Sequence, residues 1–329
     1  EDEMPNPKTD KTPAAPLLDE LSLWSHQSEA IKRMRRYLAE FHAGNVEGSA
    51  LVHMPTGSGK TGVIATIARC LPEVGCTLIL APRIALREQL ARDIQSRFFE
   101  HLSEKIPLDK LPKKVVEISG DDPIPEIEDY ESTILVSTIQ KIHNMANNSP
   151  DWGELARHIS LVIVDEGHYE PAASWSIVLR SFHTPKIIFT ATPYRNDLKF
   201  FDIDLNHVYS YTFHQALEDG FLRDVEIMPQ EPTRDPNRFV SDLLAFYDKK
   251  FPEGKGDKPR VIIRCDREDE IRKIAAILKK HKRDYVAIHE GFSDKTKKSK
   301  ERKTVPDPSK EPATFWIHQF KLMEGIDDN

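Results

Sequence analysis

An apolar run, SALVHM at residues 49–54, leads directly into the glycine-rich stretch MPTGSGKTG at residues 54–62, and a helical apolar pattern follows. Gly57 and Gly59 allow the backbone to curl so that its N–H groups face an anion, and the start of the next helix adds its positive dipole end. A strand, a glycine loop and a helix in this order are typical of a phosphate-binding loop in a parallel α/β sheet. We therefore expect a nucleotide site here.

The loop comes close to the general pattern GxxxxGK[ST], with Met54 standing where that pattern has its first glycine. Lys60 is expected to reach the β- and γ-phosphates of ATP, and Thr61 to bind Mg²⁺. The predicted ATP-binding residues of the loop are Thr56, Gly57, Ser58, Gly59, Lys60 and Thr61.

A second apolar run, LVIVDEGH at residues 161–168, ends in two adjacent carboxylates. Like charges beside a buried strand are costly unless a cation comes to the same place. A Mg²⁺ ion held by Thr61 and Asp165 would supply that charge and leave Glu166 to orient or deprotonate a water molecule. Because Asp165 and Lys60 each follow a strand, both are expected at one edge of the sheet.

Short apolar runs alternate with helical patterns along most of the chain, which favours a parallel, doubly wound α/β architecture. The expected strands of the first half lie at residues 49–54, 76–82, 133–138, 161–166 and 186–193, with helices at 26–42, 61–71 and 84–102. A second set begins near residue 237, with helices at 237–251 and 268–281 and strands at 259–265, 285–291 and 313–320. We expect a linker or disordered arm at 1–20, one domain at 21–225 and another at 226–329.

Composition fits a protein of the cytoplasm: 39% of the 329 residues are hydrophobic, and no apolar run is long enough to span a bilayer. Cys70, Cys76 and Cys265 form no metal-binding pair and are expected to be reduced and buried. The net charge of −7 is unusual for a nucleic-acid-binding protein, so any such binding requires a local basic region. The lysine-rich stretch 293–312 is either a solvated loop or a phosphate contact.

Several motifs occur in a fixed order: MPTGSGKT, APRIALREQL, VSTIQKI, DEGH and FTATPYR. This series resembles the superfamily 2 DEAD/DEAH-type helicases and translocases. DEGH together with TATPYR and YTFHQALEDGFL is most similar to their restriction-enzyme and DNA-repair branch. The resemblance implies two RecA-like P-loop domains with parallel central sheets, of which the second is expected to be incomplete at its C-terminus, because the arginine-finger motif should lie beyond FKLMEGIDD.

The resemblance also implies roles for individual residues. Lys60, Asp165 and Glu166 would be catalytic, and Gln27, in a segment similar to the Q motif, would bind adenine. Gly325 and Asp327, in a motif that also contains Glu324, would bind ATP. His168, Thr190 and Thr192 would couple the ATP site to the nucleic acid. Arg83, Thr138 and Arg195 would bind nucleic acid.

Simpler roles remain open for several of these residues. Thr190 and Thr192 could cap a strand end, Gln27 could be an ordinary polar residue at a helix start, and Arg83 could be a surface charge. Arg195 could equally form a surface salt bridge, and His168 a surface hydrogen bond.

The sequence thus predicts an ATP-dependent helicase or translocase that uses ATP and Mg²⁺ and acts on nucleic acid, with DNA as the expected polymer. No membrane partner is expected. A restriction or phage-defence setting, with a nuclease or another effector attached, is compatible with the resemblance. One alternative is a nucleic-acid-binding module that ATP gates to control an effector without strand movement. Another is a P-loop ATPase that acts on proteins, which the motifs at 81–90 and 136–142 disfavour.

Overall fold

The computed structural model describes residues 18–104, 111, 113–120, 127–149, 152–166, 178–192, 201–252, 259–294, 300–308 and 310–319. The chain divides into two compact units, Glu1–Val225 and Glu226–Asn329. None of the helices in these ranges combines the length and the apolar character that a membrane span requires.

The first unit is built on a sheet of seven strands in which every neighbouring pair is parallel, in the order β3-β4-β2-β5-β6-β1-β7. The strands are β1 (Ser49–His53), β2 (Cys76–Ala81), β3 (Lys114–Ile118), β4 (Thr133–Thr138), β5 (Ile159–Val164), β6 (Lys186–Thr190) and β7 (Ile203–Ser210). This architecture confirms the predicted parallel α/β fold. The two edge strands, β3 and β7, were not predicted from the sequence.

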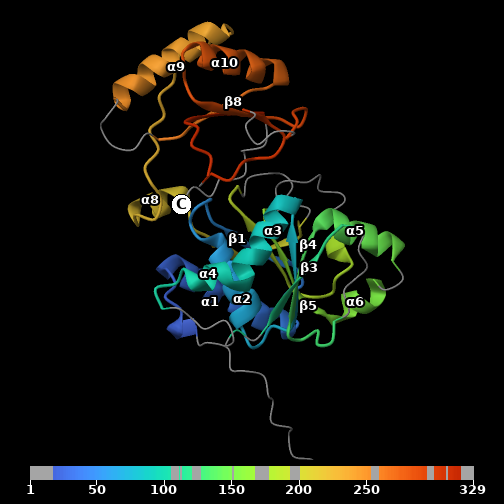
Figure 1. The fold of residues 1–329 in the computed structure, drawn as a ribbon. Helices are drawn as coiled ribbons and strands as arrows, with labels where there is room; N and C mark the ends of the chain where they lie inside the picture. Colours follow the sequence, from blue (N-terminus) through green and yellow to red (C-terminus); the bar gives the residue numbers. More distant parts are fainter. Residues whose placement is uncertain are drawn as a thin grey trace, which may run out of the picture. The chain divides into compact units, whose positions relative to one another are not determined.

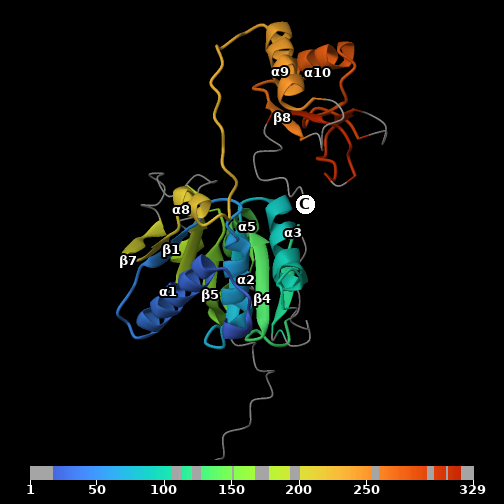
Figure 2. The ribbon, with the colours of Figure 1, turned by 90° about the vertical axis from the view of Figure 1, so that its left-hand side faces the viewer.

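Helices cover both faces of this sheet (Figures 1 and 2). One face carries α1 (Ser25–His42), α2 (Lys60–Cys70), α3 (Ile84–Arg92) and α4 (Phe98–Glu100), and the other carries α5 (Ile139–Asn148) and α6 (Trp152–His158). A short 3-10 helix, η1 (Leu18–Glu20), precedes α1, and α8 (Phe213–Glu218) follows β7. Central strands β1, β2 and β4 are buried along their whole length, as expected for a sheet covered on both faces.

The single helix expected over residues 84–102 is interrupted. A π-helical turn, η2 (Asp93–Arg97), lies between α3 and α4. The buried guanidinium of Arg69, on α2, donates to the carbonyl oxygens of Ile94 at 3.1 Å and of Gln95. A widened turn leaves carbonyls without their usual helical partners, and Arg69 satisfies two carbonyls of this segment from outside the helix.

Lys113 fixes the far end of α2. Its buried ammonium donates to the carbonyl oxygens of Ala68 at 2.8 Å, Gly75 at 3.2 Å and Val74. Burial lowers its pKa to about 8. Since cations are favourable at the negative end of a helix dipole, Lys113 anchors α2 at the end remote from the glycine loop.

The second unit has a parallel sheet of four strands in the order β10-β9-β11-β8. The strands are β8 (Val261–Arg264), β9 (Tyr285–Ile288), β10 (Glu301–Arg302) and β11 (Phe315–His318), and the helices are α9 (Pro236–Lys250) and α10 (Glu268–Lys280). The short strand β10 lies within the lysine-rich stretch 293–312, so that stretch is not a loop throughout. The three cysteines are free and buried, as predicted.

Candidate nucleotide site

The glycine loop joins β1 to α2 and has the conformation that its sequence predicts. Gly57 and Gly59 have φ angles of 85° and 80°, in the left-handed region where glycine is favoured. The Ser58 hydroxyl, fully buried, donates to the Pro55 carbonyl at 2.7 Å. Gly59 is the residue just before α2, so the loop ends at a helix N-terminus, where backbone N–H groups and the helix dipole favour an anion.

The start of α1 packs against this loop. His26 Nε2 donates to the Ser58 carbonyl at 2.8 Å, and Gln27 Nε2 donates to the Gly59 carbonyl at 3.0 Å. A Cβ atom at Gly59 would overlap the Gln27 amide, so this close approach depends on the glycine. Gln27 Oε1 accepts from the Trp24 N–H at 3.0 Å, and the side chain is buried. The oxygen and the nitrogen of the Gln27 amide are therefore both hydrogen-bonded to the protein backbone. Adenine binding by Gln27 stays a prediction.

Asp165 and Glu166 follow β5, the strand separated from β1 by β6. The Asp165 N–H donates to the Leu80 carbonyl at 2.9 Å, which extends the ladder between β5 and β2 by one bond. Glu166 has a φ of 50°, a conformation that costs a non-glycine residue energy and that is frequent at functional sites. The Lys60 ammonium donates to Glu166 Oε1, which brings the glycine loop and the carboxylate pair together.

This cluster is electrostatically unusual. The Lys60 side chain is 9% exposed, and burial lowers its pKa, with the negative charge of Asp165 acting in the opposite direction. Burial raises the pKa of Asp165, and the charge of Lys60 partly opposes that rise. Asp165 Oδ1 is buried and has no hydrogen-bond partner among the described residues. A buried carboxylate oxygen without a partner fits the oxygen ligand set of Mg²⁺.

Thr190 and Thr192 lie at the end of β6, beside the glycine loop. The Met54 N–H donates to the Thr190 carbonyl at 3.1 Å. Thr190 Oγ1 accepts from the Thr192 N–H at 3.1 Å, and Thr190 is buried whereas Thr192 is exposed. The hydrogen bond between Thr192 and Thr190 caps the end of β6. A role of these two residues in coupling the ATP site to nucleic acid stays a prediction.

Arg83 and Thr138 lie at the same edge of the sheet. Ala81 and Thr138 are register partners at the ends of β2 and β4, and Arg83 immediately precedes α3. Thr138 Oγ1 accepts from the Lys141 N–H at 3.3 Å and so caps α5. Arg83 is exposed. His168, Arg195, Glu324, Gly325 and Asp327 lie outside the described residues.

His53, the last residue of β1, also lies at this site and was not predicted from the sequence. Its Nδ1 is 2.8 Å from Ser210 Oγ on β7. Burial is the main cause that lowers its pKa, and the charge of Lys60 acts in the same direction. No sequence pattern could reveal this contact, because residues 53 and 210 are brought together only by the pairing of β1 with β7.

Residues 20–195 match the family described as "Type III restriction enzyme, res subunit". Over 191 residues the chain is 27% identical to a protein of the archaeon Sulfurisphaera tokodaii named "DNA 3'-5' translocase XPB2". The alignment covers 58% of this chain and 35% of that protein, so the chain spans about a third of the length of this relative.

Solved helicase structures have the same fold. MrfA, a DUF1998 helicase whose crystal structure was determined bound to DNA, superposes with a TM-score of 0.59 at 14% identity, over 93% of this chain and 43% of that one. Dbp5 of S. cerevisiae, bound to RNA and ADP BeF3, gives 0.55 at 14% identity, over 94% and 77%. At such identities the likeness establishes the fold of two RecA-like domains and not a shared substrate.

Proposed function

The chain belongs to the family described as the res subunit of type III restriction enzymes, among the superfamily 2 helicases and translocases, and on this basis we propose that it is an ATP-driven motor that moves along DNA. DNA is proposed because the archaeal relative is named a DNA translocase and MrfA was crystallised with DNA. The Dbp5 structure contains RNA, so the first experiment is to determine whether the protein acts on DNA or on RNA.

The observation that carries the proposal is the contact between Lys60 and Glu166, with Asp165 beside them, at the edge of the sheet where the glycine loop begins a helix. The loop N–H groups and Lys60 would bind the triphosphate. Thr61 and Asp165 would hold Mg²⁺, which when bound supplies positive charge to the phosphate oxygens. Glu166 would orient the attacking water and accept its proton.

The ion pair also suggests how ATP binding prepares the base. In this structure the ammonium of Lys60 is held by the carboxylate of Glu166. To bind phosphate, Lys60 must give up this contact, and Glu166 then becomes available to accept a proton from water. The left-handed backbone of Glu166 is a strained conformation of the kind that is frequent at functional sites.

Contacts with the polymer would come from the same edge of the first sheet. Arg83 follows β2 and Thr138 ends the neighbouring strand β4, so both would reach one sugar–phosphate backbone at this edge. Thr190 and Thr192 link the end of β6 to the glycine loop and would relay the nucleotide state, together with His168. A restriction or phage-defence setting with an attached nuclease is the cellular context that we propose.

The proposal is tested by measuring ATP hydrolysis by the full-length natural protein with single-stranded DNA, duplex DNA or RNA added, beside Glu166→Gln. Glu166→Gln should bind ATP normally and hydrolyse it about 10²–10⁴-fold more slowly, the usual contribution of a general base. Stimulation by one polymer identifies the track. Hydrolysis that ignores every polymer would overturn the motor, and stimulated hydrolysis without movement along the strand would favour an ATP-gated regulatory module.

A further inference from the structure

The two edges of the sheet in the second unit differ in how their charged side chains are distributed and paired. Its strands β8, β9, β10 and β11 are parallel, so their amino ends share one edge and their carboxyl ends share the other. Ligands of parallel α/β sheets bind at the carboxyl edge, and the amino edge has no role in the function proposed above. A basic surface nevertheless lies at the amino edge.

This basic surface is formed where two helices end. It consists of Lys249 and Lys250, in the last turn of α9, Lys279 and Lys280, in the last turn of α10, and Lys282 and Arg283, which follow α10. All are exposed except Arg283, which is half-buried. The two carboxylates among them, Asp248 and Asp284, leave a formal local charge of +4 over residues 248–250 and 279–284, in a chain whose net charge is −7.

Three contacts bring these segments together at the amino edge. Arg283 forms an ion pair with Asp248, which joins the ends of α9 and α10. The Tyr247 hydroxyl donates to the Pro259 carbonyl at 3.0 Å, which places the end of α9 beside the start of β8. The Phe315 N–H donates to the Asp284 carbonyl at 3.2 Å, beside the start of β11. The cations are therefore neighbours on one surface, although Lys250 and Lys279 are 29 positions apart in the sequence.

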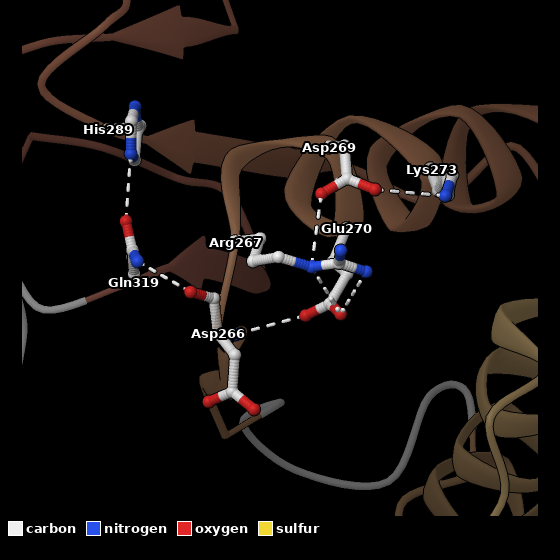
Figure 3. A network of polar contacts seen from close by, with 7 residues as sticks. All are labelled: Asp266, Arg267, Asp269, Glu270, Lys273, His289 and Gln319. Carbon is white, nitrogen blue, oxygen red and sulfur yellow. Dashed lines mark hydrogen bonds and ion pairs between the residues drawn. The ribbon is translucent and has the colours of Figure 1, made fainter.

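At the carboxyl edge, in contrast, Arg267 and Lys273 both have carboxylate partners. Figure 3 shows Arg267 between Asp269 and Glu270, and Lys273 beside Asp269. At the amino edge, Arg283 is paired with Asp248, Lys250 with Glu226 at 2.5 Å, and Asp284 with Lys300 at 2.6 Å. Within the described parts of the chain, no carboxylate lies within ion-pair distance of Lys249, Lys279, Lys280 and Lys282.

Favourable interaction with the helix dipoles explains only part of this surface. Lysines in the last turn of α9 and α10 complement the negative helix ends, an effect that fades beyond that turn. Lys282 and Arg283 lie beyond α10, and the dipole does not require two helix ends to be paired into one surface. Clustered exposed cations repel one another in the absence of an anionic partner, which points to a polyanion.

We propose that this basic surface is a second contact site for the phosphate backbone of duplex DNA, separate from the carboxyl edges of both sheets. The proposal rests on the function proposed above, because it takes DNA as the polymer. Exposed lysines on flexible stems suit sequence-independent contact with a phosphate backbone, and such contacts release counterions. Duplex beyond the motor track would be held by these lysines, so that DNA remains bound when the motor contacts are weak.

The test compares wild type with the triple variant Lys279→Gln, Lys280→Gln and Lys282→Gln, in the full-length protein. Glutamine keeps the helix propensity at positions 279 and 280, and the three changes remove three charges. The control is Lys32→Gln, Arg33→Gln and Arg36→Gln on the exposed face of α1, which changes the net charge by the same amount. Affinity for a duplex DNA and for polyglutamate is measured over a range of salt concentrations, together with basal ATP hydrolysis and the melting temperature, Tm.

The triple variant should weaken duplex binding roughly tenfold or more at low salt and reduce the salt slope by about 0.9 for each lysine that contacts a phosphate. Basal hydrolysis and the control variant's DNA affinity should stay at the wild-type level. An unchanged duplex affinity and slope would overturn the proposal and leave the lysines a helix-end role, and a loss confined to polyglutamate would assign the surface to an acidic protein. Absence of DNA binding by the wild type would overturn the proposed motor as well, so the two failures are distinguishable.

Discussion

The carboxyl edges of the two sheets have the same backbone plan and different chemistry. In the first unit, β1 leads through a glycine loop into α2, and buried Lys60 contacts Glu166 beside Asp165. In the second unit, β8 leads into α10 without a glycine, and the strand ends are tied by His289 and Gln319. His289 Nε2 is 2.9 Å from Gln319 Oε1, and Gln319 Nε2 donates to the Asp266 carbonyl (Figure 3).

The difference shows what a reactive site requires beyond a parallel sheet. At the first edge, Lys60 and Asp165 are buried, so their pKa values shift, and Asp165 Oδ1 has no hydrogen-bond partner among the residues that the structure describes. At the second edge, charged groups are exposed and paired with one another, which satisfies them without any ligand. The architecture positions side chains at an edge, and burial then decides which of them can act on a substrate.

Removing the cation at each edge gives the largest contrast. Lys60→Ala should reduce kcat/KM for ATP by about 10²–10³-fold or more, since a preorganised positive group in a buried site is lost. The matched change in the second unit, Arg267→Ala just before α10, should leave the KM for ATP unchanged. Steady-state hydrolysis at saturating polymer measures both. Equal effects of the two variants on ATP hydrolysis would contradict the prediction that only the first edge binds the nucleotide.

Adding one methyl group to a glycine at each edge should have an intermediate effect. Gly59→Ala places a Cβ against the Gln27 amide at a positive φ and should lower the free energy of unfolding by about 2–3 kcal/mol. Gly291→Ala meets Glu268 Oε2 at 2.7 Å, the far end of a half-buried flexible side chain that can shift, and should cost less than about 1 kcal/mol.

Denaturant unfolding compares these glycine variants, and Gly44→Ala is the control for the φ effect, because Gly44 has a φ of 74° and open space around it. Gly44→Ala should cost about 1 kcal/mol. If Gly59→Ala costs no more than Gly44→Ala, the contact between α1 and the loop does not constrain the site.

The smallest predicted effect is a gain in stability. Burial raises the pKa of Asp165 above its ordinary value of 3.8, so the folded state binds a proton more tightly than the unfolded state does. The free energy of unfolding then falls as pH rises from 3.8 through the raised pKa. Asp165→Asn removes this cost. At pH values above the raised pKa of Asp165, the variant should have a Tm roughly 2–4 °C higher than wild type, and at lower pH it should gain little.

Melting curves over a series of pH values from 3.8 upward test this prediction, and hydrolysis should be lost in the same variant. Asp266→Asn, an exposed carboxylate at the other edge, is the control and should change stability by less than about 0.5 kcal/mol. A Tm for Asp165→Asn below that of wild type at pH 8 would show that attraction to Lys60 outweighs the cost of burial.

Much of the fold was predictable because central strands leave a strong apolar pattern. The runs that form β1, β2, β4, β5 and β6 were expected. The edge strands β3 and β7 were missed, since a strand with one neighbour keeps exposed polar residues, as in IDLNHVYS. The π-helical turn after α3 was missed as well, because the partner that stabilises it, Arg69, lies on another helix.

The candidate site was also only partly predictable. Lys60, Asp165 and Glu166 were expected at one edge because each follows a strand. The sequence could not predict that Lys60 contacts Glu166, that Gln27 holds the loop, or that His53 contacts Ser210. These contacts join residues that are 32 to 157 positions apart.

The sequence by itself determined the parallel α/β fold, the glycine loop and the place of the two carboxylates, because hydrophobic periodicity and left-handed glycines act over a few residues. Tertiary structure decided the rest. Burial set the pKa directions of Lys60 and Asp165, and the meeting of α9 with α10 gathered the basic surface. Burial and charge density depend on which distant segments pack together, a property that no local stretch of sequence contains.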